Sequence, residues 1–92
     1  MKLGLVTDCL GYIPFNEMVK TAAGLGFQTL ELATGNWSQA PHLNLEKLLS
    51  SAVAREEMRT VLEEHQISIC ALNCSGNQLA PGETGRRHHD VV

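Results

Sequence analysis

The most informative segment of this chain runs Gly26-Phe27-Gln28-Thr29-Leu30-Glu31-Leu32-Ala33. Gly26 suits the left-handed conformation in which many helices end. The apolar residues that follow it predict a β-strand over 28–33. The residues before the segment have helical spacing, with apolar side chains at i, i+3, i+4, i+7 and i+8: Phe15, Met18, Val19, Ala22 and Ala23. The chain therefore passes from an amphipathic helix directly into a strand.

The same alternation extends in both directions along the sequence. The other elements we expect are a strand at Lys2–Thr7, a loop at Thr34–Asn44, a helical turn at Leu45–Leu49 capped by Asn44, a helix capped by Ser50 or Ser51, a strand at Ile67–Asn73, a loop at Cys74–Pro81 and a helix from Glu83 or Thr84. The order βαβαβα is typical of right-handed βαβ units and a parallel sheet.

Two packing predictions follow from these patterns. The strand at Lys2–Thr7 is short and apolar, so we expect it to be buried on both faces. In the helix after Ser51, the residues that recur at helical spacing should face inward: Val53, Ala54, Met58, Val61, Leu62 and His65.

Composition limits the class of protein. The chain has 92 residues, 43% of them apolar, and a net charge of -3, which fits a single globular unit over residues 1–92. An acidic balance disfavours nucleic-acid binding. The sequence contains neither an apolar run of about 20 residues nor a signal-peptide pattern, so we expect a cytoplasmic protein without a membrane partner. Cys9, Cys70 and Cys74 show no CxxC spacing and are interpreted as reduced thiols.

A carboxylate interrupts the apolar strand at Glu31, between Leu30 and Leu32. A parallel sheet flanked by helices is dry on both faces, so this charge must be paired, hydrated in a cavity or bound to a ligand. We favour a functional role for Glu31 near the carboxyl ends of the strands. The alternative is an internal structural ion pair with a Lys or Arg from a missing strand.

Polar residues also follow the third predicted strand. Asn73 ends it, and Ser75 and Asn77 come next, where α/β proteins place binding groups. Their amide and hydroxyl groups could bind a polyol, although an ordinary Asn/Ser/Gly turn explains the same residues.

The loop at 34–44 holds two further candidates. Trp37 offers an apolar face for a sugar ring and His42 a proton donor or acceptor, so both could line a substrate pocket. The alternative, which we favour, is that Trp37 anchors the loop to the body of the protein.

No metal or nucleotide motif is complete. His88, His89 and Asp90 are adjacent on a predicted helix, about 100° apart, and cannot converge on one ion. The pair Gly24 and Gly26 ends a helix instead of opening one, so it is not a dinucleotide fingerprint.

Three stretches together carry a resemblance to a known family. They are Leu30-Glu31-Leu32-Ala33-Thr34-Gly35-Asn36-Trp37, Ala40-Pro41-His42-Leu43-Asn44-Leu45 and Ala71-Leu72-Asn73-Cys74-Ser75-Gly76-Asn77-Gln78-Leu79-Ala80-Pro81. With them the chain resembles the sugar phosphate isomerase/epimerase family of xylose isomerase-like TIM barrels, over essentially all 92 residues.

The resemblance implies a (β/α)₈ barrel that binds a sugar or cyclitol and a divalent cation (Mn, Mg, Co or Zn), with proton transfer beside a carbonyl. A barrel takes roughly 250 residues, so the chain would supply its first three βα units. The family's metal ligands usually come from later strands. No metal ligand or catalytic residue is therefore assigned to this chain, which is expected to be inactive alone. The substrate-facing roles implied are those of Glu31, Asn73, Ser75 and Asn77.

The last predicted helix reaches Val92 without a terminating signal, so we expect a chain that is cut short. Three units would leave a sheet face and an edge open, to be covered by the missing barrel portion or by self-association. A second hypothesis is a small standalone α/β binding module that completes its sheet by dimerisation. A third, a DNA repair barrel, would need a ligand His after the third strand, where Cys74-Ser75-Gly76-Asn77 stands.

Overall fold

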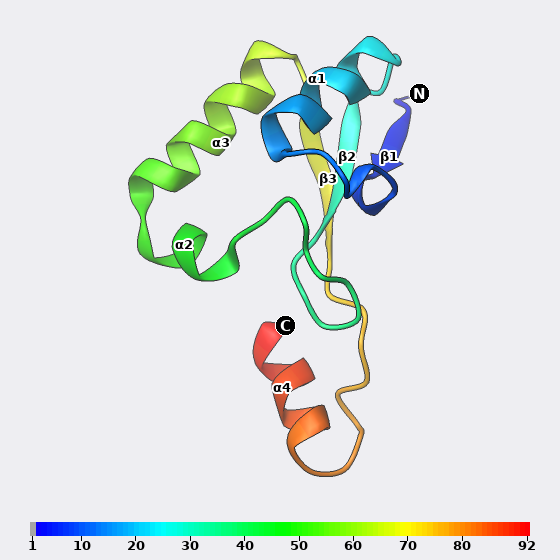
Figure 1. The fold of residues 1–92 in the computed structure, drawn as a ribbon, viewed down its shortest axis with the longest axis vertical. Coiled ribbons are helices and arrows are strands. Elements are labelled where there is room, and N and C mark those ends of the chain that lie inside the picture. Colours follow the sequence, from blue (N-terminus) through cyan, green and yellow to red (C-terminus); the bar gives the residue numbers. More distant parts are fainter. Residues whose placement is uncertain (1) are drawn as a thin grey trace.

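The chain folds as a three-stranded parallel sheet in which each strand is followed by helix, described in the computed structural model for residues 2–92, and the last helix lies beyond the carboxyl ends of the strands (Figure 1). The strands are β1 (Gly4–Val6), β2 (Thr29–Ala33) and β3 (Ser68–Asn73), all parallel, in the spatial order β1-β2-β3. The helices are η1 (Thr7–Leu10), α1 (Phe15–Gly24), α2 (Leu45–Ser50), α3 (Ala52–Glu64) and α4 (Glu83–Val91). The predicted α/β class and the alternation of elements are confirmed.

Local side-chain chemistry sets the ends of the helices. The Asn44 side chain accepts a hydrogen bond from the Lys47 N–H at 3.1 Å and so caps α2, as expected. Ser51 accepts from the Ala54 N–H at 3.2 Å, which selects Ser51 over Ser50 as the cap of α3. Gly26 follows α1 with φ +93°, the left-handed conformation that its position predicted.

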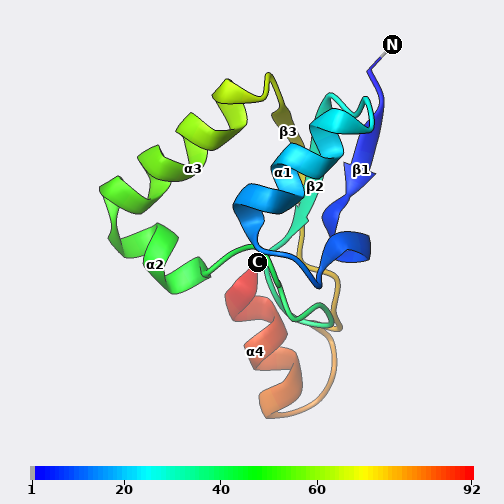
Figure 2. The ribbon, with the colours of Figure 1, turned by 45° about the horizontal axis from the view of Figure 1, so that its top comes forward.

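One face of the sheet carries the core. α1 and α3 lie over this face (Figure 2), and the buried apolar side chains come from both helices, from β2 and from the residue before β3: Met18, Val19, Ala22, Leu30, Leu32, Leu62 and Ile67. Side chains alternate along a strand, so Glu31 points to the opposite face from Leu30 and Leu32. That opposite face carries the predicted functional carboxylate.

The register of β2 against β3 shifts beside Glu31. Leu30 pairs with Ile69 but Glu31 pairs with Ala71, which leaves Cys70 as an extra residue in β3. Such a bulge re-aims the side chains that follow it. It restores alignment at Leu32 and Leu72, so β2 and β3 end level with one another at Ala33 and Asn73.

Two packing predictions are wrong. β1 is not buried on both faces, because Gly4 and Val6 are exposed and Leu5 is half-buried. β1 is an edge strand, and helices cover only one side of the sheet. Val53 does not face inward either, being 67% exposed. It lies in the first turn of α3, the end that diverges from the sheet, whereas Leu62 near the other end reaches the core (Figure 1).

Apolar side chains remain exposed on both edge strands. Leu72 of β3 is 62% exposed, and Val6 of β1 and Ile69 of β3 are also open to solvent. No helix within residues 2–92 is long and apolar enough to cross a membrane.

Candidate functional site

The carboxyl ends of β2 and β3 bring two predicted site residues into contact. Asn73 Nδ2 donates a hydrogen bond to Glu31 Oε2 at 3.2 Å. Both side chains are half-buried. The salt bridges within residues 2–92 involve other carboxylates, and the alternative interpretation of Glu31, an ion pair with a Lys or Arg from a missing strand, stays a prediction. Glu31 is therefore a partly exposed carboxylate held by a neutral amide.

Ser75 extends this contact into the loop after β3. Asn73 Oδ1 accepts hydrogen bonds from the Ser75 N–H at 2.9 Å and from the Ser75 hydroxyl at 2.7 Å. The two bonds orient the amide so that its Nδ2 faces Glu31. Three of the six predicted site residues thus form one hydrogen-bonded chain at the end of the sheet, which we call the rim triad: Glu31, Asn73 and Ser75.

Asn77 lies beyond the rim triad, in the turn that leads to α4. Its Oδ1 accepts a hydrogen bond from the Leu79 N–H at 3.0 Å, and its own N–H donates to His88 Nδ1 at 2.7 Å. The first bond is the local side-chain turn expected of Asn in a loop. The side chain of Asn77 is therefore engaged in shaping the loop.

Trp37, the residue expected to anchor its loop, lies beside the rim triad. The backbone N–H of Trp37 donates a hydrogen bond to the Ser75 carbonyl at 3.0 Å, and 70% of the residue is exposed. Its indole meets the His88 ring edge to face, with centroids 6.4 Å apart. Trp37 is therefore an exposed aromatic residue that contacts α4 next to the rim triad.

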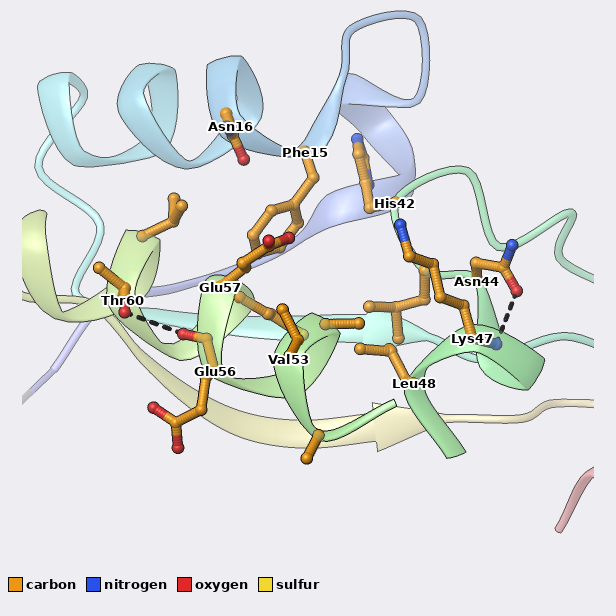
Figure 3. A pocket seen from close by; sticks show the side chains of 15 residues that line it. Phe15, Asn16, His42, Asn44, Lys47, Leu48, Val53, Glu56, Glu57 and Thr60 are labelled. Carbon is orange, nitrogen blue, oxygen red and sulfur yellow. Dashed lines mark hydrogen bonds between the residues drawn. The ribbon is translucent and has the colours of Figure 1, made fainter. Parts of the chain in front are cut away.

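His42 lies apart from the rim triad and anchors the loop instead. The residue is 9% exposed, and its Nε2 lies 3.0 Å from the Leu10 carbonyl and 3.1 Å from the Ile13 carbonyl. Because both neighbours are acceptors, Nε2 carries the proton. His42 lines a largely apolar groove between α1, α2 and α3, into which Phe15 and Leu48 point (Figure 3). The structure does not bring it into contact with Glu31 or Asn73.

The structure also shows polar residues near the rim triad that the sequence did not single out. Thr34 donates its hydroxyl to the Asn73 carbonyl at 3.2 Å. Asn36 donates to the carbonyls of Cys74 and His88 at 2.9 and 3.1 Å. Ser38 donates to Asp8 Oδ2 at 2.6 Å and so joins the loop to η1, which follows β1. These contacts cross between loops, so no periodicity or motif could have signalled them.

The donor set does not form a cage for a metal ion. Within residues 2–92, no three His, Cys, Asp or Glu side chains gather in a group that could hold one. Glu31 is the single carboxylate of the rim triad, and its partner is an amide. Cys9, Cys70 and Cys74 are all free thiols.

Comparison with known proteins gives one informative match. No protein-family model matches the chain. The chain is similar, with 55% identity over all 92 residues, to "Uncharacterized protein YfiH" of Bacillus subtilis (strain 168). It spans 29% of the length of that relative.

Proposed function

We propose that this chain provides the first three βα units of a TIM barrel that isomerises or epimerises a sugar or cyclitol, and that the rim triad binds the substrate. The observation that carries the proposal is the hydrogen bond between Glu31 and Asn73. It joins a carboxylate and an amide where the strands of α/β enzymes present their binding groups.

The rim triad has the chemistry that a polyol requires. A carboxylate accepts hydrogen bonds from sugar hydroxyls, and an ionised acceptor makes roughly twice as strong a bond as a neutral one. Ser75 adds a hydroxyl that can donate or accept, and Trp37 adds an exposed aromatic face next to it. The set therefore combines polar groups for hydroxyls with a flat surface for the ring.

Two observations support the barrel. Glu31 lies on the sheet face opposite the helical layer, which in a closed barrel is the interior. The similar protein of Bacillus subtilis is more than three times as long as this chain, which is enough for the roughly 250 residues of a barrel. We infer that further βα units cover the exposed side chains of β3, among them Leu72.

We assign substrate binding alone to residues 2–92. The divalent cation that the resemblance implies does not fit the donors here, since the rim triad contains one carboxylate and no His or Cys. Proton transfer beside the sugar carbonyl is accordingly placed on groups outside the rim triad. Asn77 and His42, which also figured in the sequence-based site, take loop-shaping and loop-anchoring roles in this proposal.

A second candidate is a standalone module that completes its sheet by pairing with another copy. The exposed apolar residues on both edge strands favour it, because open edges are ready templates for pairing. The molecular mass of the natural protein separates the two candidates. A protein of 92 residues that forms a discrete dimer supports the module, and a chain of barrel length supports the enzyme.

The rim triad is tested by Glu31→Gln in the whole natural protein, assayed against aldoses, ketoses, their phosphates and inositols. Losing a hydrogen bond to a charged group costs about 1.5–3 kcal/mol, so kcat/KM should fall roughly 10- to 150-fold. The melting temperature should change little, because Gln still accepts from Asn73. Glu46→Gln, on the exposed surface of α2, is the matched control. A variant that loses stability but keeps its turnover would assign Glu31 to the scaffold.

A further inference from the structure

The His88 side chain of α4 contacts the loop that follows the rim triad. The Asn77 N–H donates to His88 Nδ1 at 2.7 Å. An N–H donor requires an acceptor, so Nδ1 carries no proton and the ring hydrogen resides on Nε2. The half-buried ring thus acts as a neutral acceptor for the backbone of the loop between β3 and α4.

The same residue also holds the loop between β2 and α2. The His88 carbonyl accepts from Asn36 Nδ2 at 3.1 Å, and that amide also donates to the Cys74 carbonyl at 2.9 Å. The His88 ring meets the indole of Trp37 at an interplanar angle of 89°. His88 therefore contacts both loops that border the rim triad.

Two glycines allow this close approach. A Cβ added to Gly76 would lie 2.9 Å from His88 Nδ1, closer than real Cβ contacts. Gly35 has φ +148°, and a Cβ added there would lie 3.3 Å from Val91 Cγ1 on the same helix. Both loops carry glycine where α4 approaches them, so the attachment of α4 depends on the backbone shape of both loops.

We propose that His88 is a positioning residue that clamps the two rim loops together, so that Ser75 remains on Asn73 and Trp37 remains beside them. The role of His88 in substrate binding rests on the proposed function. The contacts by which His88 holds the two loops together do not depend on it. The clamp needs two properties of the side chain: an acceptor at the place of Nδ1 and a ring against Trp37. These two properties can be removed one at a time.

Two variants of the whole natural protein separate these properties, and two more serve as controls. His88→Asn keeps an acceptor, because Asn Oδ1 is as many bonds from the backbone as His Nδ1. His88→Phe keeps the ring and removes the acceptor. His89→Asn, at the exposed neighbouring position, is the matched control. Trp37→Phe identifies the Trp37 contribution to fluorescence.

Two readouts need no substrate. In His88→Phe, hydrogen exchange at the Asn77 backbone amide should accelerate about five- to tenfold, the effect expected from losing one neutral hydrogen bond. In His88→Asn, the exchange rate of this amide should stay near that of the natural protein. Trp37 emission should shift in His88→Asn, which lacks the ring, and change less in His88→Phe. Equal exchange in the Asn and Phe variants, or an equal effect of His89→Asn, would overturn the clamp.

A third readout connects the clamp to the proposed function. In His88→Phe, KM for the sugar should rise about tenfold while kcat changes less, because the position of the loops governs binding of the sugar ring. In His88→Asn, which keeps the acceptor, KM should stay close to the value of the natural protein. If kcat and KM are unchanged while exchange at Asn77 accelerates, the clamp exists but does not position the site. If the natural protein turns over no sugar, the proposed function is wrong. Hydrogen exchange at Asn77 and Trp37 fluorescence still test whether His88 holds the two loops together.

Discussion

At the scale of single residues, the pairing of Glu31 with Asn73 is the feature that combines sequence and structure. Each residue alone has an ordinary explanation, as a strand carboxylate or as a turn amide. Parallel strands end at one edge, so residues at the ends of neighbouring strands are brought within reach. The combination of a carboxylate with a fixed amide is what makes the rim triad a candidate for binding hydroxyls.

This pairing leads to a prediction for Asn73→Asp. The new carboxylate would face Glu31 where the amide now donates at 3.2 Å. Two like charges this close disfavour folding by on the order of 1–2 kcal/mol at a half-exposed site, in addition to the lost hydrogen bond. The repulsion raises carboxyl pKa values in the folded variant, so the loss of stability should be largest at neutral pH and shrink as acid protonates the pair.

Urea denaturation at pH 7 and pH 4 measures this effect. Asn77→Asp is the control, because the Leu79 N–H that Asn77 accepts from can be bound equally well by a carboxylate. A pH-independent loss in Asn73→Asp, or an equal loss in both variants, would show that Glu31 does not face Asn73.

Residue roles in the loops were harder to predict than those at strand ends. The position of Glu31 follows from strand alternation, and that of Asn73 from where a strand stops. His42 and Trp37 belong to a loop whose path depends on contacts with distant segments, such as the Leu10 and Ile13 carbonyls. Sequence patterns contain no record of those contacts, so they do not show that His42 is the residue that binds its loop to these carbonyls.

At the scale of elements, helix periodicity and caps predicted most boundaries. The predicted strand at Ile67–Asn73 is β3 at Ser68–Asn73, and the helix expected from Glu83 begins there. Burial was predicted less well. Hydrophobic periodicity shows which side of an element is apolar, but the burial of that side depends on which other elements cover it. Val53 and Val6 of β1 are exposed because no neighbouring element within residues 2–92 covers them.

The cap of α3 provides a test at this scale. Ser51→Ala removes the hydrogen bond to the Ala54 N–H and should destabilise the protein by about 1 kcal/mol, the usual value of an N-cap. Ser50→Ala is the control, because the Ser50 hydroxyl donates to carbonyls of its own helix and caps nothing. Circular dichroism melts of the two variants should differ by several degrees. Equal melting temperatures would contradict the assignment of Ser51.

At the scale of the whole molecule, the sheet is covered on one side and open at both edges. A domain of this size buries only about 60% of the surface of its unfolded chain, so exposed apolar strands weigh heavily in its stability. The similarity to a much longer protein fits a sheet that continues. Covering β3 with a further unit would bury Leu72 and Ile69, which are exposed in these three units.

We therefore expect the 92-residue chain on its own to self-associate or to melt with low cooperativity. Leu72→Lys should reduce the association, because charge on an edge strand opposes pairing. Val53→Lys, which adds the same charge to an exposed apolar position away from the strands, is the control. Light scattering and calorimetry measure both properties. A monodisperse monomer with a single cooperative transition would show that the three units suffice.

In the proposed enzyme, Glu31 faces the interior of a closed barrel and binds a sugar hydroxyl. A crystal structure of the whole natural protein, grown with the sugar or cyclitol that the activity panel selects, tests it most directly. We predict eight strands closed around the Glu31 side of the sheet, with a hydroxyl of the ligand within hydrogen-bond distance of Glu31 or Asn73. Glu31 on an outer surface, or a ligand bound away from the rim triad, would exclude substrate binding by Glu31 inside a barrel.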